Sequence, residues 1–257
     1  MASLQALIFD VDGTLADTER DGHRVAFNRA FAAAGLDWEW SVDRYGELLR
    51  VTGGKERIRQ YLLEDHPEVL EEADIDARIR ALHEAKTRHY VAMLEGGAIP
   101  LRPGVERLLD EAAAAGLRLA IATTTTPANV TALLRATLGE DGPARFEVIA
   151  AGDIVPAKKP APDIYTHALA EMDLTAADAL ALEDSDNGVR SARDAGLEVV
   201  VTTNDYTRDQ DFSGALAVLD GFGAPGAPAQ SLHGAVLDGD RVDVATLRRW
   251  FAATAGA

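Results

Sequence analysis

Four short polar segments carry the residue types of a catalytic site, and each comes after an apolar run of strand length. They are Asp10-Val11-Asp12-Gly13-Thr14, Thr123-Thr124-Thr125-Thr126, Lys158-Lys159-Pro160 and Glu183-Asp184-Ser185. Taken singly, each has a structural explanation, because acidic and hydroxyl residues also form turns and cap helices. Those explanations do not account for the shared position of the segments after successive strands. Carboxylates, hydroxyls and lysine in this arrangement suit phosphoryl transfer.

Phosphoryl transfer gives distinct roles to the acidic residues. A phosphate monoester is doubly anionic, so a carboxylate attacks it only when a cation such as Mg²⁺ reduces the repulsion. We expect Asp10, at its strand end, to be the nucleophile and to form an aspartyl phosphate. Asp12 would protonate the leaving alkoxide and then deprotonate the attacking water. Asp184, with Glu183 beside it, would complete the oxygen ligands of the metal.

The elements that must position these residues alternate along the chain. Apolar runs of strand length lie at residues 6–9, 119–122, 146–150, 179–182 and 198–202. Helical apolar spacing separates the later runs, which predicts an α/β fold with a Rossmann-like parallel sheet covered on both faces. Ligands of such sheets bind beyond the carboxyl ends of the strands. There Thr123 and Lys159 would donate to the phosphoryl oxygens, where charge accumulates.

A long helical segment follows the first strand. Apolar residues recur at helical spacing in residues 26–31 and again in residues 75–93. We therefore expect residues 16–98 to form an inserted α-helical cap, and residues 1–15 and 99–257 to form the core. A C-terminal extension would begin at about residue 224, with an irregular Gly, Ala and Pro-rich loop at 221–230 and a terminal helix at 244–253.

Composition limits the classes of function. The chain has 25 Lys and Arg against 42 Asp and Glu, a formal net charge of −17 without a basic stripe, so nucleic acid is not an expected partner. It has no cysteine, which excludes disulfides and thiolate chemistry. No apolar stretch approaches the ~20 residues of a membrane helix, and the N-terminus lacks a signal-peptide pattern. We expect a cytoplasmic monomer without a membrane partner.

The four polar segments, in order, resemble the four motifs of the haloacid dehalogenase superfamily. The helical segment after the first motif resembles the cap of the subclass that includes β-phosphoglucomutase. This resemblance covers nearly the whole chain and implies a phosphoric monoester hydrolase. It also implies that Mg²⁺ is held by Asp10, the main-chain oxygen of Asp12, and Asp184.

Further segments narrow the resemblance to CbbY proteins. They are Asp17-Thr18-Glu19-Arg20-Asp21-Gly22-His23, Thr52-Gly53-Gly54-Lys55-Glu56-Arg57, Ala151-Gly152-Asp153, Tyr206-Thr207 and Asp211-Phe212. CbbY proteins are phosphatases that remove xylulose-1,5-bisphosphate, an inhibitor of Rubisco, the carboxylase of the Calvin cycle. The resemblance implies a sugar-bisphosphate phosphatase with xylulose 5-phosphate and inorganic phosphate as products.

A bisphosphate needs a second cationic site, because the strand ends hold only one phosphoryl group. The cap segment with Gly53 and Gly54 allows close backbone approach, and Lys55 and Arg57 supply donors, although a loop entering a surface helix has the same composition. The other residues expected at the substrate are Glu19 at sugar hydroxyls, His23 between cap and core, Thr124 and Thr125.

Alternatives to a specific phosphatase remain open at this point. A phosphosugar mutase of the β-phosphoglucomutase kind would use the same Asp10 and Asp12, so the motifs do not separate the two activities. A broad sugar-phosphate phosphatase is a further alternative. A non-catalytic scaffold protein is the least favoured, because both aspartates are present.

Overall fold

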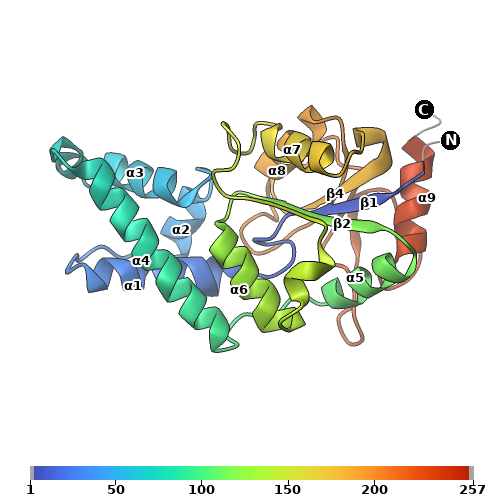
Figure 1. Ribbon diagram of the computed structural model, residues 1–257, viewed down its shortest axis with the longest axis horizontal. Coiled ribbons are helices and arrows are strands. Elements are labelled where there is room, and N and C mark those ends of the chain that lie inside the picture. The colour runs from blue at the N-terminus through green and yellow to red at the C-terminus, as the bar shows by residue number, and fades with distance from the viewer. Residues whose placement is uncertain (1–2, 255–257) are drawn as a thin grey trace.

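A seven-stranded sheet forms the centre of the protein, whose computed structural model describes residues 3–254 (Figure 1). The strand order is β3-β2-β1-β4-β5-β6-β7. The strands are β1 (Ala6–Phe9), β2 (Arg118–Thr123), β3 (Val148–Ala151), β4 (Ala179–Glu183), β5 (Glu198–Thr202), β6 (Ala217–Leu219) and β7 (Ser231–Gly234). Neighbouring strands are parallel except β6 and β7, which pair antiparallel. The predicted α/β fold with a parallel sheet is confirmed.

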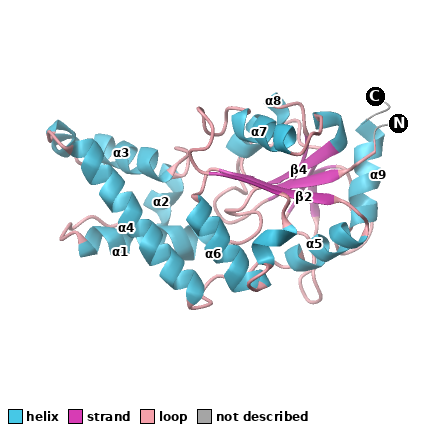
Figure 2. Ribbon diagram, viewed as in Figure 1, coloured by secondary structure: helices cyan, strands magenta, loops and turns pink. Residues whose placement is uncertain are grey.

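Helices cover both faces of the sheet (Figure 2). The helices α5 (Val105–Ala114), α6 (Pro127–Leu138) and α9 (Val244–Thr254) pack on one face, and α7 (Asp163–Glu171) and α8 (Asp186–Asp194) pack on the other. Alternate side chains of a strand point to opposite faces, so Leu7 and Phe9 of β1 join the first core, and Ala6 and Ile8 join the second. Burial on both faces explains the continuous apolar runs of the sequence.

A helical segment projects from one end of the sheet, at the left of Figure 1. It contains a π-helical turn (Glu19–His23), α1 (Arg24–Ala33), α2 (Val42–Leu48), α3 (Gly54–Asp65) and α4 (Ile75–Glu95). Its aromatic and aliphatic side chains form a third core, separate from the two cores of the sheet. The segment lies between β1 and α5 in the chain, and α4 packs against α6. Short 3₁₀ turns lie at Pro67–Glu71, Gly142–Arg145 and Ala176–Asp178.

The end of the chain departs from the sequence prediction. The strands β6 and β7 were not predicted, because one has three residues and the other is an exposed edge strand without apolar alternation. The residues between them include the predicted irregular loop at 221–230, and α9 follows. Within residues 3–254, no helix is both long and apolar enough to span a membrane.

Candidate active site

The carboxyl edge of the sheet brings together charged side chains from three segments. Asp10 follows β1, Glu183 ends the neighbouring β4, and Lys159 comes from the loop between β3 and α7. The Lys159 Nζ lies 2.7 Å from Asp10 Oδ1 and 2.6 Å from Glu183 Oε1, and it also donates to the Ala122 carbonyl at 2.9 Å. Tyr165 donates its hydroxyl to the same Glu183 oxygen at 2.5 Å. One buried lysine therefore bridges two carboxylates.

The same edge holds more negative charge than this lysine neutralises. Burial raises the pKa of Asp10 to about 8, with Lys159 opposing the rise and Glu183 and Asp12 adding to it. Burial also raises the pKa of Asp184 well above its usual range, with Asp10 and Glu183 adding to it. A buried carboxylate with like charges nearby is stabilised by a cation that takes the place of its proton.

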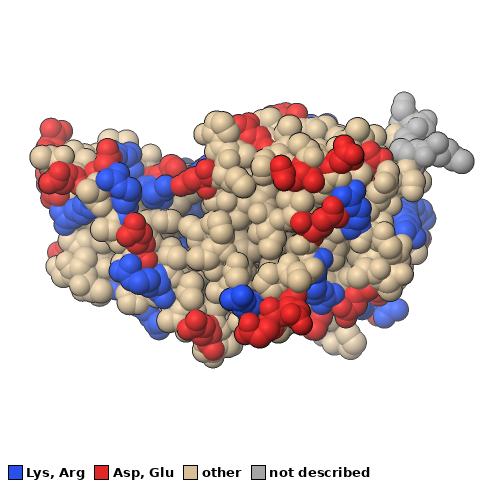
Figure 3. Space-filling view, in the orientation of Figure 1, with Lys and Arg blue, Asp and Glu red and all other residues tan. Residues whose placement is uncertain are grey.

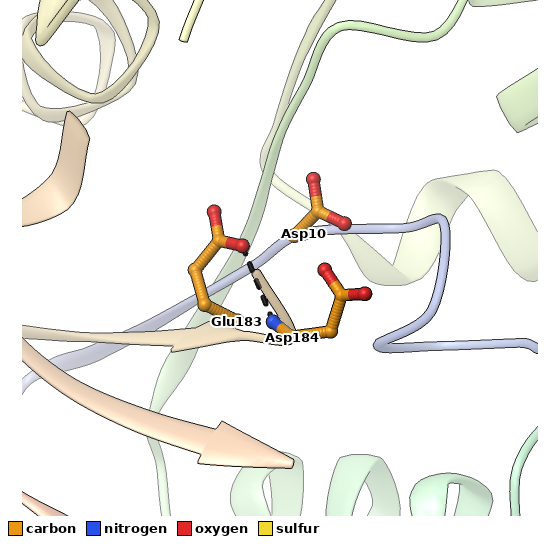
Figure 4. Close-up of side chains that lie close together, drawn as sticks. All are labelled: Asp10, Glu183 and Asp184. Atoms are coloured by element: carbon orange, nitrogen blue, oxygen red, sulfur yellow. Dashed lines mark hydrogen bonds between the residues drawn. The ribbon is translucent and has the colours of Figure 1, made fainter. Parts of the chain in front are cut away.

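The acidic residues Asp10, Glu183 and Asp184 are arranged as a cation site requires. Their ligand oxygens all lie within 4.8 Å of one another, and all three residues are buried. Figure 4 shows the three carboxyl groups projecting from the ends of the two neighbouring strands. Carboxylate oxygens suit a hard divalent cation such as Mg²⁺, so the donor set fits that ion. Glu183 Oε1 already accepts hydrogen bonds from Lys159 and Tyr165. Asp10 and Asp184 accept fewer hydrogen bonds and are therefore the better candidates for metal ligands.

The side chain of Asp12 points to the helical segment. Its Oδ1 accepts from the Thr18 hydroxyl at 2.5 Å and lies 2.8 Å from His23 Nε2, in the π-helical turn. Burial opposes ionisation of Asp12, but the His23 contact and the Thr18 hydrogen bond outweigh it and lower its pKa to about 2. Asp12 is therefore held as a carboxylate by residues of the segment that follows β1.

Two glycines make room for the acidic side chains. Gly13 has φ +91°, and a Cβ there would collide with the Asp184 carboxylate and with Asn204 Nδ2. Gly188, at the start of α8, lies against the Glu183 carboxylate, which any Cβ would overlap. The sequence therefore needs glycine at both positions for these carboxylates to reach the sheet edge.

Two neighbouring cavities contain most of the residues singled out in the sequence. A cavity of about 450 Å³ is lined by Asp10, Asp12, Glu19, Arg57, Thr123, Thr124, Lys159 and Asp184, among others. A smaller one of about 40 Å³ is lined by His23, Gly53, Gly54 and Thr125, and shares Asp12, Glu19, Arg57 and Thr124 with the first. The strand ends and the helical segment thus enclose one continuous group of candidate residues.

Lys55 is the exception among the expected substrate-binding residues, because it lines neither cavity. It donates to Asp153 at 2.5 Å, across the seam between α3 and the loop after β3. Lys158 pairs with Glu56 at 2.8 Å and with Asp153 at 2.9 Å in the same place. Figure 3 shows basic and acidic side chains adjoining where the helical segment meets the core.

Two polar residues that the sequence analysis did not single out also lie at the site. Lys86 lines the smaller cavity from α4, and Asn204, after β5, donates to Asp184 Oδ2 at 2.7 Å. Lys86 had a detectable signal, because it is a charged residue on the buried face formed by Leu82 and Tyr90. Asn204 had a signal too, because it lies beyond the carboxyl end of a predicted strand.

The fold and this sheet edge define a class of enzyme. The family model for haloacid dehalogenase-like hydrolases matches residues 4–196, and the chain belongs to this family. Protein CbbY of Rhodobacter capsulatus is 57% identical over 212 residues, which are 82% of this chain and 91% of that protein. The plasmid protein CbbY of Cupriavidus necator is 50% identical over 248 residues, 96% of each chain.

A solved structure agrees with these relatives. The crystal structure of a mutant CbbY from Rhodobacter sphaeroides in complex with xylulose-(1,5)bisphosphate has 49% sequence identity and a TM-score of 0.78. The match covers 85% of this chain and 94% of that chain. Within its family the chain is therefore a CbbY-like phosphatase.

Proposed function

We propose that this phosphatase hydrolyses xylulose-1,5-bisphosphate to xylulose 5-phosphate and inorganic phosphate with Mg²⁺, and so protects Rubisco from an inhibitor. The observation that carries the proposal is the presence of two sets of buried cations in two adjoining cavities, Lys159 in the larger and Lys86 in the smaller, with Arg57 lining both. The buried cluster around Asp10 and Lys159 suits the reacting phosphoryl group, and Arg57 with Lys86 suits a second one. The similarity to a CbbY protein crystallised with that bisphosphate supports this substrate.

The reaction would proceed in two steps on Asp10. Asp12 is a carboxylate in the substrate-free site, and the negative charge of a phosphoryl group bound beside it would favour uptake of a proton. The carboxylate oxygen of Asp10 attacks phosphorus, the bond from phosphorus to the sugar oxygen breaks, and the protonated Asp12 gives its proton to that oxygen. Water then attacks the aspartyl phosphate, Asp12 takes its proton, and Asp10 and inorganic phosphate are released.

In the substrate-free site Lys159 donates to Asp10, Glu183 and the Ala122 carbonyl, so it would turn the N–H that Asp10 accepts toward the phosphoryl oxygens. Thr123, which lines the same cavity, would donate its hydroxyl to these oxygens.

The acidic residues of the sheet edge would have two different roles, metal binding and positioning of Lys159. Asp10, Asp184 and the main-chain oxygen of Asp12 would hold Mg²⁺, which when bound offsets the repulsion between the nucleophile and the phosphoryl oxygens. Glu183 would hold Lys159 in place, because both it and Asp10 accept from the lysine ammonium group. A carboxylate in this position keeps the lysine charged, and the pKa of Lys159 is raised above its usual range by Asp10 and Glu183 against the effect of burial.

Arg57 and Lys86 would bind the distal phosphate. Arg57 is 7% exposed, donates from Nη1 to the Tyr45 hydroxyl, and has a buried Nε without a hydrogen-bond partner among the described residues. Lys86 is 4% exposed between the rings of Phe27 and Tyr90. Burial lowers the pKa of Lys86 to about 8, although Asp12 and Glu19 oppose this. An anion beside these two cations would offset their desolvation.

This proposal moves the second cationic site from Lys55 to Lys86. The hydrogen bond of Lys55 to Asp153 takes its ammonium group to the outer seam. Lys86, one helix away on α4, supplies the second cation from inside the cavity that Gly53 and Gly54 line. Glu19 accepts from the Tyr45 hydroxyl and borders both cavities, which fits a contact with sugar hydroxyls.

Phosphate release from a substrate panel tests the proposed substrate. The panel holds xylulose-1,5-bisphosphate, ribulose-1,5-bisphosphate, fructose-1,6-bisphosphate and β-glucose 1-phosphate, each with Mg²⁺. We expect selective release from the xylulose compound. Isomerised glucose phosphate without net phosphate release would instead indicate a mutase, and slow release from every compound would indicate a broad phosphatase.

Three variants test the distal site. Arg57→Met and Lys86→Met should each raise KM for xylulose-1,5-bisphosphate by about tenfold or more, the loss expected for a charged hydrogen bond. Both should hydrolyse p-nitrophenyl phosphate, which has no distal phosphate, within about threefold of the parent rate. Lys55→Ala should raise KM for the bisphosphate by less than about threefold. A larger effect of Lys55→Ala than of Lys86→Met would contradict the assignment.

A further inference from the structure

Arg102 lies where the chain returns from the helical segment to the core, and its guanidinium group joins three segments at the sheet edge. It donates to the main-chain carbonyl of Gly13, in the loop after β1. It also donates to the carbonyls of Thr202 at 3.2 Å and Thr203 at 2.6 Å, at the end of β5, and to that of Asp220 at 3.3 Å, after β6. The residue is buried, with 8% of its surface exposed.

The chemistry of these contacts selects arginine. The Nη1 atom donates to Thr202 Oγ1 at 3.1 Å as well, and Nε lies 3.3 Å from Asp17 Oδ1. Both terminal nitrogens of the planar guanidinium therefore have hydrogen-bond acceptors, and Nε is paired with the Asp17 carboxylate, as a buried charge requires. A lysine at Arg102 would have three donors on one atom, too few and too close together to reach the same acceptors.

The contact to Gly13 matters because the preceding peptide group carries the main-chain oxygen of Asp12. Gly13 is fixed from both sides: its N–H donates to the Ala16 carbonyl at 2.8 Å, and its carbonyl accepts from Arg102. The carbonyl of Asp12 belongs to the same peptide group as the Gly13 N–H, so the bond to Ala16 sets the direction of the Asp12 main-chain oxygen. Arg102 holds the next peptide, between Gly13 and Thr14, and so restricts rotation of the loop about the Gly13 Cα. Gly13 holds this conformation with φ +91°.

Arg102 also joins the two crossings of the chain between core and helical segment. Its own N–H donates to the Leu15 carbonyl at 2.9 Å, and its side chain contacts Asp17 two residues further along the first crossing. A displacement of either crossing would therefore act on the guanidinium group and, through it, on the Gly13 peptide.

We propose that Arg102 is a positioning residue that, by holding the Gly13 carbonyl, stabilises the loop conformation in which the Asp12 main-chain oxygen would be available to Mg²⁺. This inference rests on the Mg²⁺ site proposed above. It assigns to Arg102 no contact with substrate. Its effect is to pre-form one ligand of the metal site, so that binding the ion does not have to order the loop after β1.

A matched control exists five residues along the chain. Arg107 also donates to main-chain carbonyls, those of Phe222 at 3.0 Å, Gly223 at 3.1 Å and Val242 at 3.0 Å. Those carbonyls belong to the C-terminal part of the chain, away from the loop after β1. Arg107→Lys therefore removes a similar set of hydrogen bonds without touching the Gly13 peptide.

Calorimetric titration of the full-length enzyme with Mg²⁺, without substrate, tests the inference. We expect Arg102→Lys to raise the Mg²⁺ dissociation constant by about 10–100-fold, as residues that orient metal ligands do. The parent and Arg107→Lys should agree within about twofold, although Arg107→Lys also loses thermal stability. In rate measurements Arg102→Lys should need more Mg²⁺ for half-maximal velocity, with KM for p-nitrophenyl phosphate nearly unchanged at saturating Mg²⁺.

The outcomes separate this inference from the proposed function. If the parent binds no Mg²⁺, both are overturned. If the parent binds Mg²⁺ and a folded Arg102→Lys binds it equally well, only the role of Arg102 is overturned. Should Arg102→Lys fail to fold, Thr202→Val decides, because it removes one side-chain acceptor of Arg102 and keeps the backbone contacts. An unchanged Mg²⁺ dissociation constant in Thr202→Val would then overturn the inference, and a two- to fivefold rise, about 0.4–1 kcal/mol, would support it.

Discussion

The adjacent residues Lys158 and Lys159 belong to two different charged clusters, one exposed to solvent and one buried. The sheet-edge cluster consists of Asp10, Lys159 and Glu183, whose side chains are 10%, 5% and 0% exposed. The seam cluster consists of Lys55, Glu56, Asp153 and Lys158, whose side chains are 35%, 44%, 58% and 17% exposed. The distances within the two clusters are similar, at 2.6–2.7 Å in the first and 2.5–2.9 Å in the second.

The difference between the clusters shows that environment, more than distance, decides what an ion pair does. In the buried sheet-edge cluster each charge strongly affects the protonation of its neighbours, so removing one changes the chemistry of the others. In the solvated seam cluster, water and salt screen the same contacts, and each contributes little to stability. Variants of the two clusters should therefore differ by orders of magnitude in their effect on turnover.

The largest effect should come from the centre of the sheet-edge cluster. Asp10→Asn keeps the size and a hydrogen-bond acceptor for Lys159 but removes the carboxylate that we propose as the nucleophile. Turnover of the sugar bisphosphate should fall by about 10⁴-fold or more, while far-UV circular dichroism and the melting temperature stay near the parent's. Asp153→Asn in the seam cluster is the control and should stay within about threefold. Near-parental turnover by Asp10→Asn would contradict covalent catalysis at this residue.

A second, smaller effect should appear when pH is varied without Mg²⁺. Burial raises the pKa of Asp10 from 3.8 to about 8, so between these values the folded protein binds a proton that the unfolded chain releases. The metal-free protein should therefore lose stability as pH rises through this window. Mg²⁺ binds the ionised carboxylates, so the stabilisation it gives should increase over the same range.

Melting temperatures in EDTA and in excess Mg²⁺, at several values between about pH 6 and pH 8, measure this effect. The gap between the two curves should widen with pH. The seam cluster provides the contrast, because Lys55 and Lys158 lower the pKa of Asp153 to about 2, against the effect of burial, and Asp153 stays ionised throughout. A gap that stays constant across the range would contradict a raised pKa in the metal-free cluster.

The sheet-edge residues could be predicted from the sequence because local patterns determine where they lie. The apolar runs of β1, β2 and β4 end at Asp10, Thr123 and Glu183, and parallel strands bring their carboxyl ends to one edge. The third segment was located less directly, since Lys159 lies in a loop after β3. The polarity of these residue types beside buried strands indicated a shared site at this edge, and the catalytic role of each residue stays a prediction.

The direction of individual side chains across the seam could not be predicted in the same way. Lys55 and Arg57 are two residues apart at the start of α3, so the helix turns them to different sides. Which side faces the cavity depends on how the helical segment packs on the core. The contacts of Arg102 were harder still to predict from the sequence, because its partners are main-chain carbonyls, which every residue possesses. Strands as short as β6 also carry no periodic signal.

The smallest effect should come from the seam pair of Lys55 and Asp153. Removing Lys55 alone leaves Asp153 paired with Lys158 at 2.9 Å. A single substitution therefore does not measure the interaction energy between Lys55 and Asp153. A double-mutant cycle with Lys55→Ala and Asp153→Ala isolates it, with unfolding by urea as the measurement. Since both side chains are more than a third exposed, the coupling should be about 0.2–1 kcal/mol.

Salt sharpens this last test, because it acts on the seam pair and much less on the buried pair of Asp10 and Lys159. Raising the ionic strength from about 0.1 M to 1 M shortens the screening length from about 10 Å to about 3 Å. The coupling of Lys55 with Asp153 should then fall towards zero, while turnover at saturating Mg²⁺ changes far less than in Asp10→Asn. A coupling energy above about 2 kcal/mol that does not change with salt would show that the seam pair behaves like a buried ion pair. The contrast between the two clusters would then no longer hold.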